Sequence, residues 1–236
     1  MSLTSQQLIS LATQKAKVPG MTIQAGQMLN VILEELAQTY DLSIGLNTST
    51  ITLNAGTGTG PYTLPTNYLR MSSDILYITA GAQVTKITLQ QLDQLTAVGA
   101  AAAAPTNWTT DVSLTPPVLY VWPPANATIP LKIRYYGSFT DIVTPETSSA
   151  VPWFPCQGYL SSRLLGELYA LNSKNEMAQL YLGDTPVGAA GILRRYLFVQ
   201  GDRQSDAQQI LSDRRMYGQM SNPFPPPYQP ISGSGP

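Results

Sequence analysis

The stretch Val118-Leu-Tyr-Val-Trp122, Pro123-Pro-Ala-Asn-Ala127, Ile129-Pro-Leu-Lys-Ile-Arg-Tyr-Tyr-Gly137 decides the fold class. Two runs rich in β-branched and aromatic residues flank a turn that contains proline and asparagine, which is typical of a β-hairpin. A similar arrangement lies upstream, where Ser49-Thr-Ile-Thr-Leu53 and Pro61-Tyr-Thr-Leu-Pro-Thr-Asn-Tyr-Leu-Arg70 flank a Gly/Thr loop. The sequence therefore predicts two β-hairpins in the middle of the chain.

Helical patterns lie on both sides of this β-rich middle. Thr4 or Ser5 can cap a first helix that ends before Pro19, and a second helix is predicted from roughly Thr22 to Tyr40. The face predicted for this second helix carries Met28, Val31, Ile32, Glu35 and Leu36. After Pro155, further helices are predicted around Tyr159–Leu171, Met177–Tyr181 and Ile192–Leu197, with a continuation at Ala207, Ile210 and Leu211.

Together these patterns predict an α+β protein with three parts. Residues 1–41 and 150–218 form a helical bundle, residues 42–149 form a β-hairpin-rich insertion, and residues 219–236 form an extended tail. Within the insertion, Leu76–Ile78 and Val84–Ile87 flank a turn at Gly81, and Thr88–Thr96 forms one short helix.

The end of the chain, residues 219–236, has six prolines and no charged residue. A segment with so little apolar content favours an extended polyproline conformation and does not fold alone. We expect a partner to hold this extended Pro-rich tail in a groove, with Phe224, Tyr228 and Ile231 as the anchoring side chains.

The chain is unusually poor in charge. Only 11% of its 236 residues are charged and the net charge is −1, compared with about 25% charged residues in an average soluble domain. Neutral polar surfaces suit large permanent interfaces, because few ions must be desolvated when partners dock. The alternative interpretation of this composition is a low-charge extracellular β-domain. The absence of a basic excess argues against tight nucleic-acid binding.

The residues needed for common catalytic sites are missing or poorly arranged. The chain has no histidine, which removes the usual general base and Ser-His or Cys-His pairs. Glu34, Glu35 and Asp41 could supply the paired carboxylates of a sugar hydrolase, but adjacent helical positions such as Glu34 and Glu35 point about 100° apart. The lone cysteine, Cys156, can form no internal disulfide. We expect no enzyme activity, no cofactor and no metal.

The aromatic residues of the second predicted hairpin allow two interpretations. Tyr120, Trp122, Tyr135 and Tyr136 could stack on bases or sugars, or could pack across the strands. Only Lys132 and Arg134 lie near them, so cross-strand packing is the better account. Trp153 and Phe154 precede a predicted helix and are expected to pack it against the insertion.

The order of these motifs resembles the head-to-tail adaptor proteins of short-tailed bacteriophages, the portal-docking connectors similar to tail tubular protein A. The resemblance rests on the N-terminal helices ending near Tyr40 and on Tyr62-Thr-Leu-Pro-Thr-Asn-Tyr-Leu-Arg70. It continues through Val118–Tyr136 and through Val151-Pro-Trp-Phe-Pro155, which opens the closing helices. It reaches about Gly218, and the proline-rich end has no counterpart in it.

This resemblance implies a structural virion protein. Its helical part would pack side by side into a ring, usually a dodecamer, docked beneath the portal protein. The C-terminal segments would reach into the portal, the β part would face the tail nozzle or tail fibre proteins, and DNA would pass through the lumen without specific binding during ejection. We expect several arginine, aromatic and aliphatic side chains to take part in these contacts: Arg163, Arg194, Arg195, Arg214, Arg215, Phe224, Tyr228, Ile231, Tyr120 and Trp122.

Three alternative functions stay open from the sequence. A tail-tube or neck (head-completion) protein would form its ring unaided, a carbohydrate-binding module would bind sugar through Tyr120 or Trp122, and a cell-wall hydrolase would depend on single carboxylates. The chain shows no signal peptide and no apolar run of the ~20 residues that cross a bilayer, so no membrane contact is expected. The expected location is the head-tail junction of the virion, after synthesis in the host cytoplasm.

Overall fold

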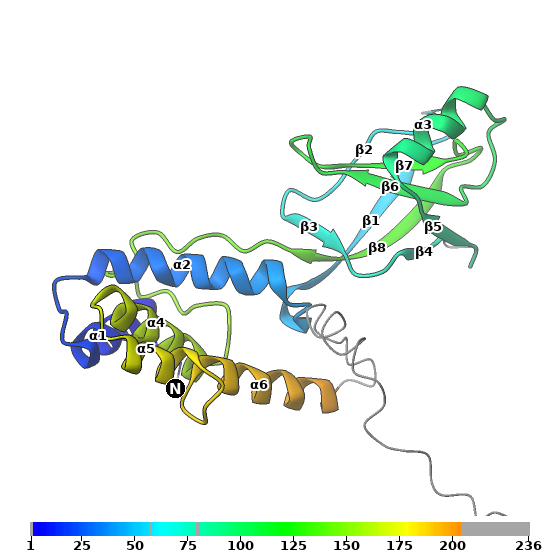
Figure 1. Cartoon of the computed structure of the whole chain (residues 1–236). Helices are drawn as coiled ribbons and strands as arrows, with labels where there is room; N and C mark the ends of the chain where they lie inside the picture. Colours follow the sequence, from blue (N-terminus) through cyan, green and yellow to red (C-terminus); the bar gives the residue numbers. More distant parts are fainter. Residues whose placement is uncertain (1, 57, 79–80, 204–236) are drawn as a thin grey trace, which may run out of the picture.

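The computed structural model describes residues 2–56, 58–78 and 81–203. In this part of the chain, a group of helices and a strongly curved sheet lie at opposite ends of the molecule (Figure 1). The helical end contains α1 (Ser5–Ala16), α2 (Thr22–Thr39), α4 (Gln157–Leu171), α5 (Asn175–Leu182) and α6 (Ala189–Arg203). The other end contains the strands and one short helix, α3 (Leu89–Val98). The protein is therefore mixed α+β, as predicted.

Local sequence sets the starts of two helices. The Thr4 hydroxyl accepts a hydrogen bond from the Gln7 backbone N–H, and the Gln7 side chain accepts one from the Thr4 backbone. The same reciprocal capping box joins Thr88 and Gln91 at the start of α3. Each box satisfies two backbone N–H groups that have no partner within the helix. The predicted helix over Thr88–Thr96 is confirmed, two residues longer at its C-terminal end.

Helix α4 occupies the centre of the helical end, because it packs against α1, α2, α5 and α6. Its buried side chains include Leu160, Leu164 and Leu168, and Phe154 lies fully buried just before it. These join the apolar residues of α1 and α2 in one continuous cluster. The two N-terminal helices therefore bury their apolar faces against a helix that follows more than 100 residues later in the chain.

The predicted apolar face of α2 was partly wrong. Val31 is exposed, whereas Leu29 and Leu33 are buried along with Ile32 and Leu36. Two overlapping sets of residues in α2 have the three- and four-residue spacing of a helical stripe, so spacing alone could not choose between them.

The sheet contains β1 (Leu46–Leu53), β2 (Tyr62–Thr63), β3 (Tyr68–Met71), β4 (Ile75–Ile78), β5 (Gln83–Lys86), β6 (Asn107–Asp111), β7 (Val118–Trp122) and β8 (Ile129–Gly137). The strand order is β1-β8-β4-β5-β6-β7-β2, and β3 also pairs with β8. The first and last strands of this order approach each other, so the sheet is nearly closed. A 3-10 turn, η1 (Ser43–Gly45), leads from the helices into β1.

Neither of the two central hairpins forms as predicted. β1 pairs antiparallel with β8 along its whole length, from Leu46 opposite Tyr136 to Leu53 opposite Ile129. β7 pairs with β6 and β2 instead of with β8. Alternation identifies a strand and its buried face but not its partner. Because β2 has only two residues, β8 offers β1 far more backbone hydrogen bonds than β2 could.

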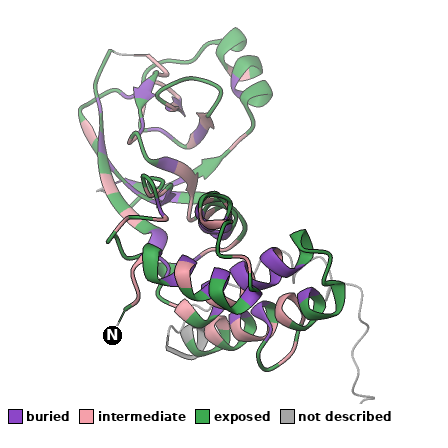
Figure 2. Ribbon diagram, turned by 90° about the vertical axis from the view of Figure 1, so that its left-hand side faces the viewer, coloured by how far each residue is buried: buried purple, intermediate pink, exposed green. Residues whose placement is uncertain are grey.

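The hairpin over β4 and β5 is confirmed, with Leu76 opposite Val84. β6 has no counterpart among the predicted strands, and it pairs in parallel with β5 after the crossover through α3. The sheet encloses its own apolar core, centred on fully buried Trp108, Leu119 and Leu131. Buried residues therefore gather in two separate regions, one at each end of the molecule (Figure 2).

Candidate interaction surfaces

Arg70 of β3 joins the sheet to the C-terminal end of α2. Its Nε and Nη2 donate hydrogen bonds to Oδ1 of Asp41 at 3.0 and 2.7 Å. Its Nη1 donates to the carbonyl oxygens of Ala37 at 2.9 Å and Gln38 at 3.2 Å, and Nη2 donates to that of Tyr40 at 3.0 Å. The last carbonyls of a helix lack intrahelical donors and carry partial negative charge, so a guanidinium is a fitting partner.

Tyr136 of β8 completes this junction. The guanidinium carbon of Arg70 lies 5.0 Å from the centroid of the Tyr136 ring, in a cation–π arrangement. Burial, together with the charge of Asp41, raises the pKa of Tyr136 to about 12, although Arg70 acts in the opposite direction. The phenol therefore stays protonated near neutral pH, and the charged pair at the junction is Arg70 with Asp41.

The segment from residue 138 to residue 156 runs back from the sheet to α4 and is fastened to the N-terminal helices. The Asn30 side chain donates to the Ile142 carbonyl at 3.1 Å and accepts from the Ile142 N–H at 3.2 Å. On either side of Ile142 in the sequence, the rings of Phe139 and Trp153 stack on each other with centroids 3.9 Å apart. Trp153 thus contacts a residue that immediately follows the sheet, in the region where the sequence predicts packing against the insertion.

A groove of about 370 Å³ lies between α2 and this returning segment. Its wall includes the stacked Phe139 and Trp153, with Leu33 of α2. The carboxylates of Glu34 and Asp141 also line it. In the described part of the chain, neither carboxylate forms an ion pair, although Glu34 accepts a hydrogen bond from Gln38.

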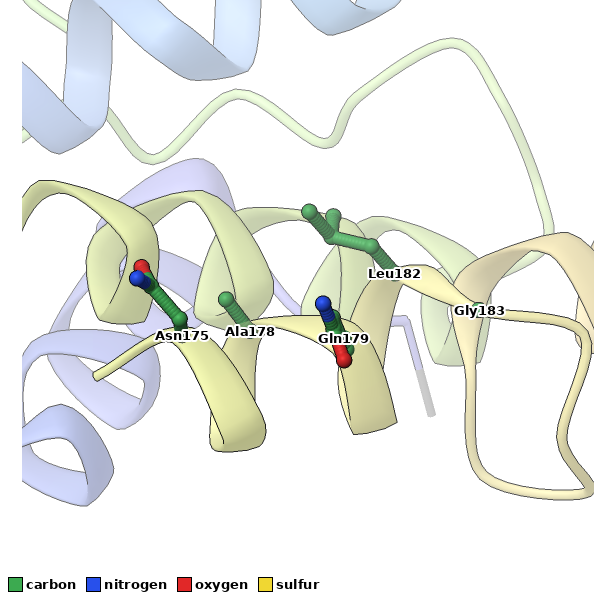
Figure 3. Close-up of a pocket in the computed structure, with 5 residues that line it drawn as sticks. All are labelled: Asn175, Ala178, Gln179, Leu182 and Gly183. Atoms are coloured by element: carbon green, nitrogen blue, oxygen red, sulfur yellow. The ribbon is translucent and has the colours of Figure 1, made fainter. Parts of the chain in front are cut away.

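A second cavity, of about 480 Å³, lies along α5 (Figure 3). It is lined by Asn175, Ala178, Gln179, Leu182 and Gly183. None of these side chains is ionisable, so the cavity offers no group for acid–base chemistry. It is an open, neutral hollow on the helical surface.

The predicted interface arginines of the helices have partners inside the chain. Arg163 pairs with Glu35 at 3.3 Å, and its Nε lies 3.1 Å from Glu167, without the angle of a hydrogen bond. Arg194 pairs with Asp184 at 2.5 Å while its side chain is 71% exposed. Arg195 donates to the carbonyl of Pro186. Arg194 and Arg195 therefore brace the loop between α5 and α6 and still face solvent.

The remaining predicted contact residues divide into two groups. Tyr120 is half-buried in β7, and Trp122, at 8% exposure, belongs to the buried residues of the same strand. Arg214, Arg215, Phe224, Tyr228 and Ile231 lie outside the described residues, as do the helical continuation at Ala207–Leu211 and the Pro-rich tail. The interface roles of all these residues stay predictions.

The carboxylates considered for sugar hydrolysis have structural partners. Asp41 binds Arg70, and Glu35 binds Arg163. Over the described ranges, the structure holds no group of three or more acidic, histidine or cysteine side chains able to bind a metal ion.

Two features escaped the sequence reasoning. Arg70 ends a predicted strand motif, and nothing local in the sequence indicates that it reaches α2. Phe198 follows the predicted helical stripe of Tyr196 and Leu197, yet it is 69% exposed. Phe198 is rotated by about 100° from Leu197 around the helix, and this rotation away from the predicted stripe was the one sign in the sequence that it is exposed.

These surfaces can be set beside known proteins. A family model described as SU10 adaptor protein matches residues 4–220, which includes every described helix and strand. The chain belongs to the SU10 adaptor protein family. No curated protein matched the chain.

Membership in the SU10 adaptor protein family makes the chain a phage structural adaptor, and it implies a virion component. The resemblance to phage adaptors drawn from the sequence is confirmed at this level. No helix among the residues that the structure describes is both long enough and apolar enough to cross a membrane.

Proposed function

We propose that this SU10-family adaptor forms a dodecameric ring beneath the portal protein and joins the portal to the tail nozzle. The family match over residues 4–220 carries the proposal. The low charge content supports it, because surfaces with 11% charged residues can be buried against neighbours with little desolvation. The helical end would form the ring, and the β end would face the next tail component.

The ring would enclose part of the channel for DNA. A chain with net charge −1 has no excess of cations to hold phosphates, so DNA could pass during ejection without being bound. This absence of attraction suits a conduit better than a nucleic-acid-binding protein.

Native mass measurement tests the proposal directly. The purified chain alone should give a monomer of 25.5 kDa, and addition of a dodecameric portal should give a complex with about one adaptor per portal subunit. A ring that forms without portal would favour the tail-tube or neck alternative. A monomer that ignores the portal would refute the role proposed here.

The Pro-rich residues 219–236 are proposed to help attach the ring to the portal. Their deletion should weaken portal attachment while the far-UV circular dichroism stays nearly unchanged, because a proline-rich tail contributes little helix or strand signal. Attachment that is unaltered by the deletion would remove this segment from the mechanism.

A further inference from the structure

The outer face of α2 combines exposed apolar residues with a carboxylate. Ile23, Gln27, Val31, Glu34 and Gln38 are all exposed, and their three- and four-residue spacing places them on one side of the helix. Ile23 is 60% exposed and Val31 is 61% exposed. Glu34 lies less than one turn beyond Val31 and has no ion-pair partner among the described residues. This set of five residues is called the α2 face below.

The outer face of α6 has the complementary composition. Phe198 is the most exposed aromatic side chain that the structure describes, and Val199 beside it is also exposed. Arg194 and Arg195 precede Phe198 by four and three residues, so both flank it on the same side of the helix. Arg195 uses two of its five N–H donors, on the carbonyls of Gly191 and Pro186. These four exposed residues, Arg194, Arg195, Phe198 and Val199, are called the α6 face.

The two faces lie on different sides of the helical end. Both α2 and α6 pack against α4, which lies between them (Figure 1). One molecule therefore cannot join its own faces without unpacking α4. Two complementary patches on different sides of a subunit give a head-to-tail contact, and such contacts close into rings when the rotation allows.

We propose that the α6 face of one copy docks on the α2 face of the next copy. This proposal rests on the ring assembly proposed above and names the surfaces that join its subunits. Phe198 packs on Val31 of the neighbouring copy, and Arg195 pairs with the neighbour's Glu34. The partner is a second copy of this chain, because the apolar and charged groups of the two faces complement each other.

The spacing along the helices fits this arrangement. Val31 and Glu34 are separated by about 4.5 Å along α2, because each residue advances the helix by 1.5 Å. Phe198 and Arg195 are separated by the same number of residues along α6. When Phe198 covers Val31 in an antiparallel crossing of small angle, Arg195 lies beside Glu34, because Arg195 precedes Phe198 by three residues and Glu34 follows Val31 by three.

Disulfide trapping between two single-cysteine variants tests the proposal. Both carry Cys156→Ala, one adds Val31→Cys and the other Phe198→Cys. After oxidation of an equal mixture in the presence of the dodecameric portal, a disulfide-linked mixed dimer of twice the 25.5 kDa chain mass should form, and neither variant alone with the portal should form one. The matched control pairs Val98→Cys with Val112→Cys, two exposed valines of the β end, which should give no mixed dimer.

Charge substitution provides a second measurement. Val31→Asp or Phe198→Asp buries an unpaired carboxylate in the contact and should lower the yield of assembled ring about tenfold or more. Each variant keeps one intact face, so an equal mixture of the two should form pairs of neighbouring subunits on the portal but no closed ring. Unchanged circular dichroism identifies the variants as folded, which is expected because both residues are exposed in the monomer.

The outcomes separate this proposal from the ring function. Normal rings on the portal without the Val31–Phe198 crosslink would overturn the proposed faces and leave the adaptor function standing. The crosslink without any portal binding would support the faces and refute the portal role. Absence of both would refute both. Dimerisation of either single-cysteine variant alone would show a symmetric contact and overturn the head-to-tail arrangement.

Discussion

Replacement of Arg70 by alanine should destabilise the protein at the junction of its two ends. The substitution removes five hydrogen bonds, two to Asp41 and three to carbonyl oxygens at the end of α2. It also removes the cation–π contact with Tyr136. The side chain of Asp41, only 17% exposed, would be left without its ion-pair partner.

The expected loss in the free energy of unfolding is about 3 kcal/mol. A single hydrogen bond to a charged group contributes about 1.5–3 kcal/mol, and such bonds from one side chain are not additive. Loss of one partner from a fully buried ion pair costs about 3–5 kcal/mol, whereas an exposed pair contributes about 0–1 kcal/mol. The Arg70–Asp41 pair is partly exposed and lies between these limits. For a chain of this size the loss corresponds to a fall in Tm of roughly 6–12 °C.

Urea titration, followed by far-UV circular dichroism and tryptophan fluorescence, measures this loss. Arg70→Lys should lose less, because an ammonium keeps the charge but not the planar fork that reaches several acceptors. Arg134→Ala is the control, since this exposed arginine of β8 forms no ion pair among the described residues. If Arg70→Ala unfolds within about 0.5 kcal/mol of wild type, like a neutral surface substitution, the junction does not depend on this side chain.

Three further predictions concern other parts of the molecule. Tyr136 and Tyr159 each have a pKa raised to about 12 by burial, so the folded state favours the protonated phenols: their contribution to stability is complete below pH 10 and is lost between pH 10 and 12. Spectrophotometric titration near 295 nm should show both ionising late, and ordinary ionisation near pH 10 in the folded protein would contradict this. Gly166→Ala should destabilise the α4–α5 packing by about 1–3 kcal/mol, because a Cβ there would lie 2.6 Å from Leu182; thermal unfolding measures this, and a stabilised variant would show that α5 moves aside freely. Thr88→Ala removes the cap of α3 and should cost about 1 kcal/mol in urea titration, with no change expected if the helix does not depend on its cap.

Sequence periodicity was sufficient for the helices and the positions of most strands. The caps at Thr4 and Thr88 and the apolar residues of α4 carry their information locally, so these elements could be predicted. The buried face of α2 could not, because Val31 and Leu33 both fit a helical stripe. The choice depends on where α4 packs, which no neighbouring residue specifies.

The pairing of strands lies beyond local pattern. β1 and β8 are separated by 75 residues in the sequence, and they pair because their lengths match. The contacts of Arg70 likewise depend on the position of the sheet relative to α2. Phe198 is exposed because it lies on a different side of α6 from Leu193, five residues earlier, which is buried. The candidate surfaces were therefore harder to predict than the fold class.

The central position of α4 has a consequence for how the chain is made. Helices α1 and α2 leave the ribosome first, but the helix that covers their apolar faces follows roughly 120 residues later, which takes about 6–24 s at bacterial rates of synthesis. The sheet, whose strands all lie between α2 and α4 in the sequence, can close during that interval. The helical end is consequently the last part of each new molecule to fold. Until α4 has been made, the leucines of α1 and α2 that it later buries stay accessible to chaperones and to other nascent chains.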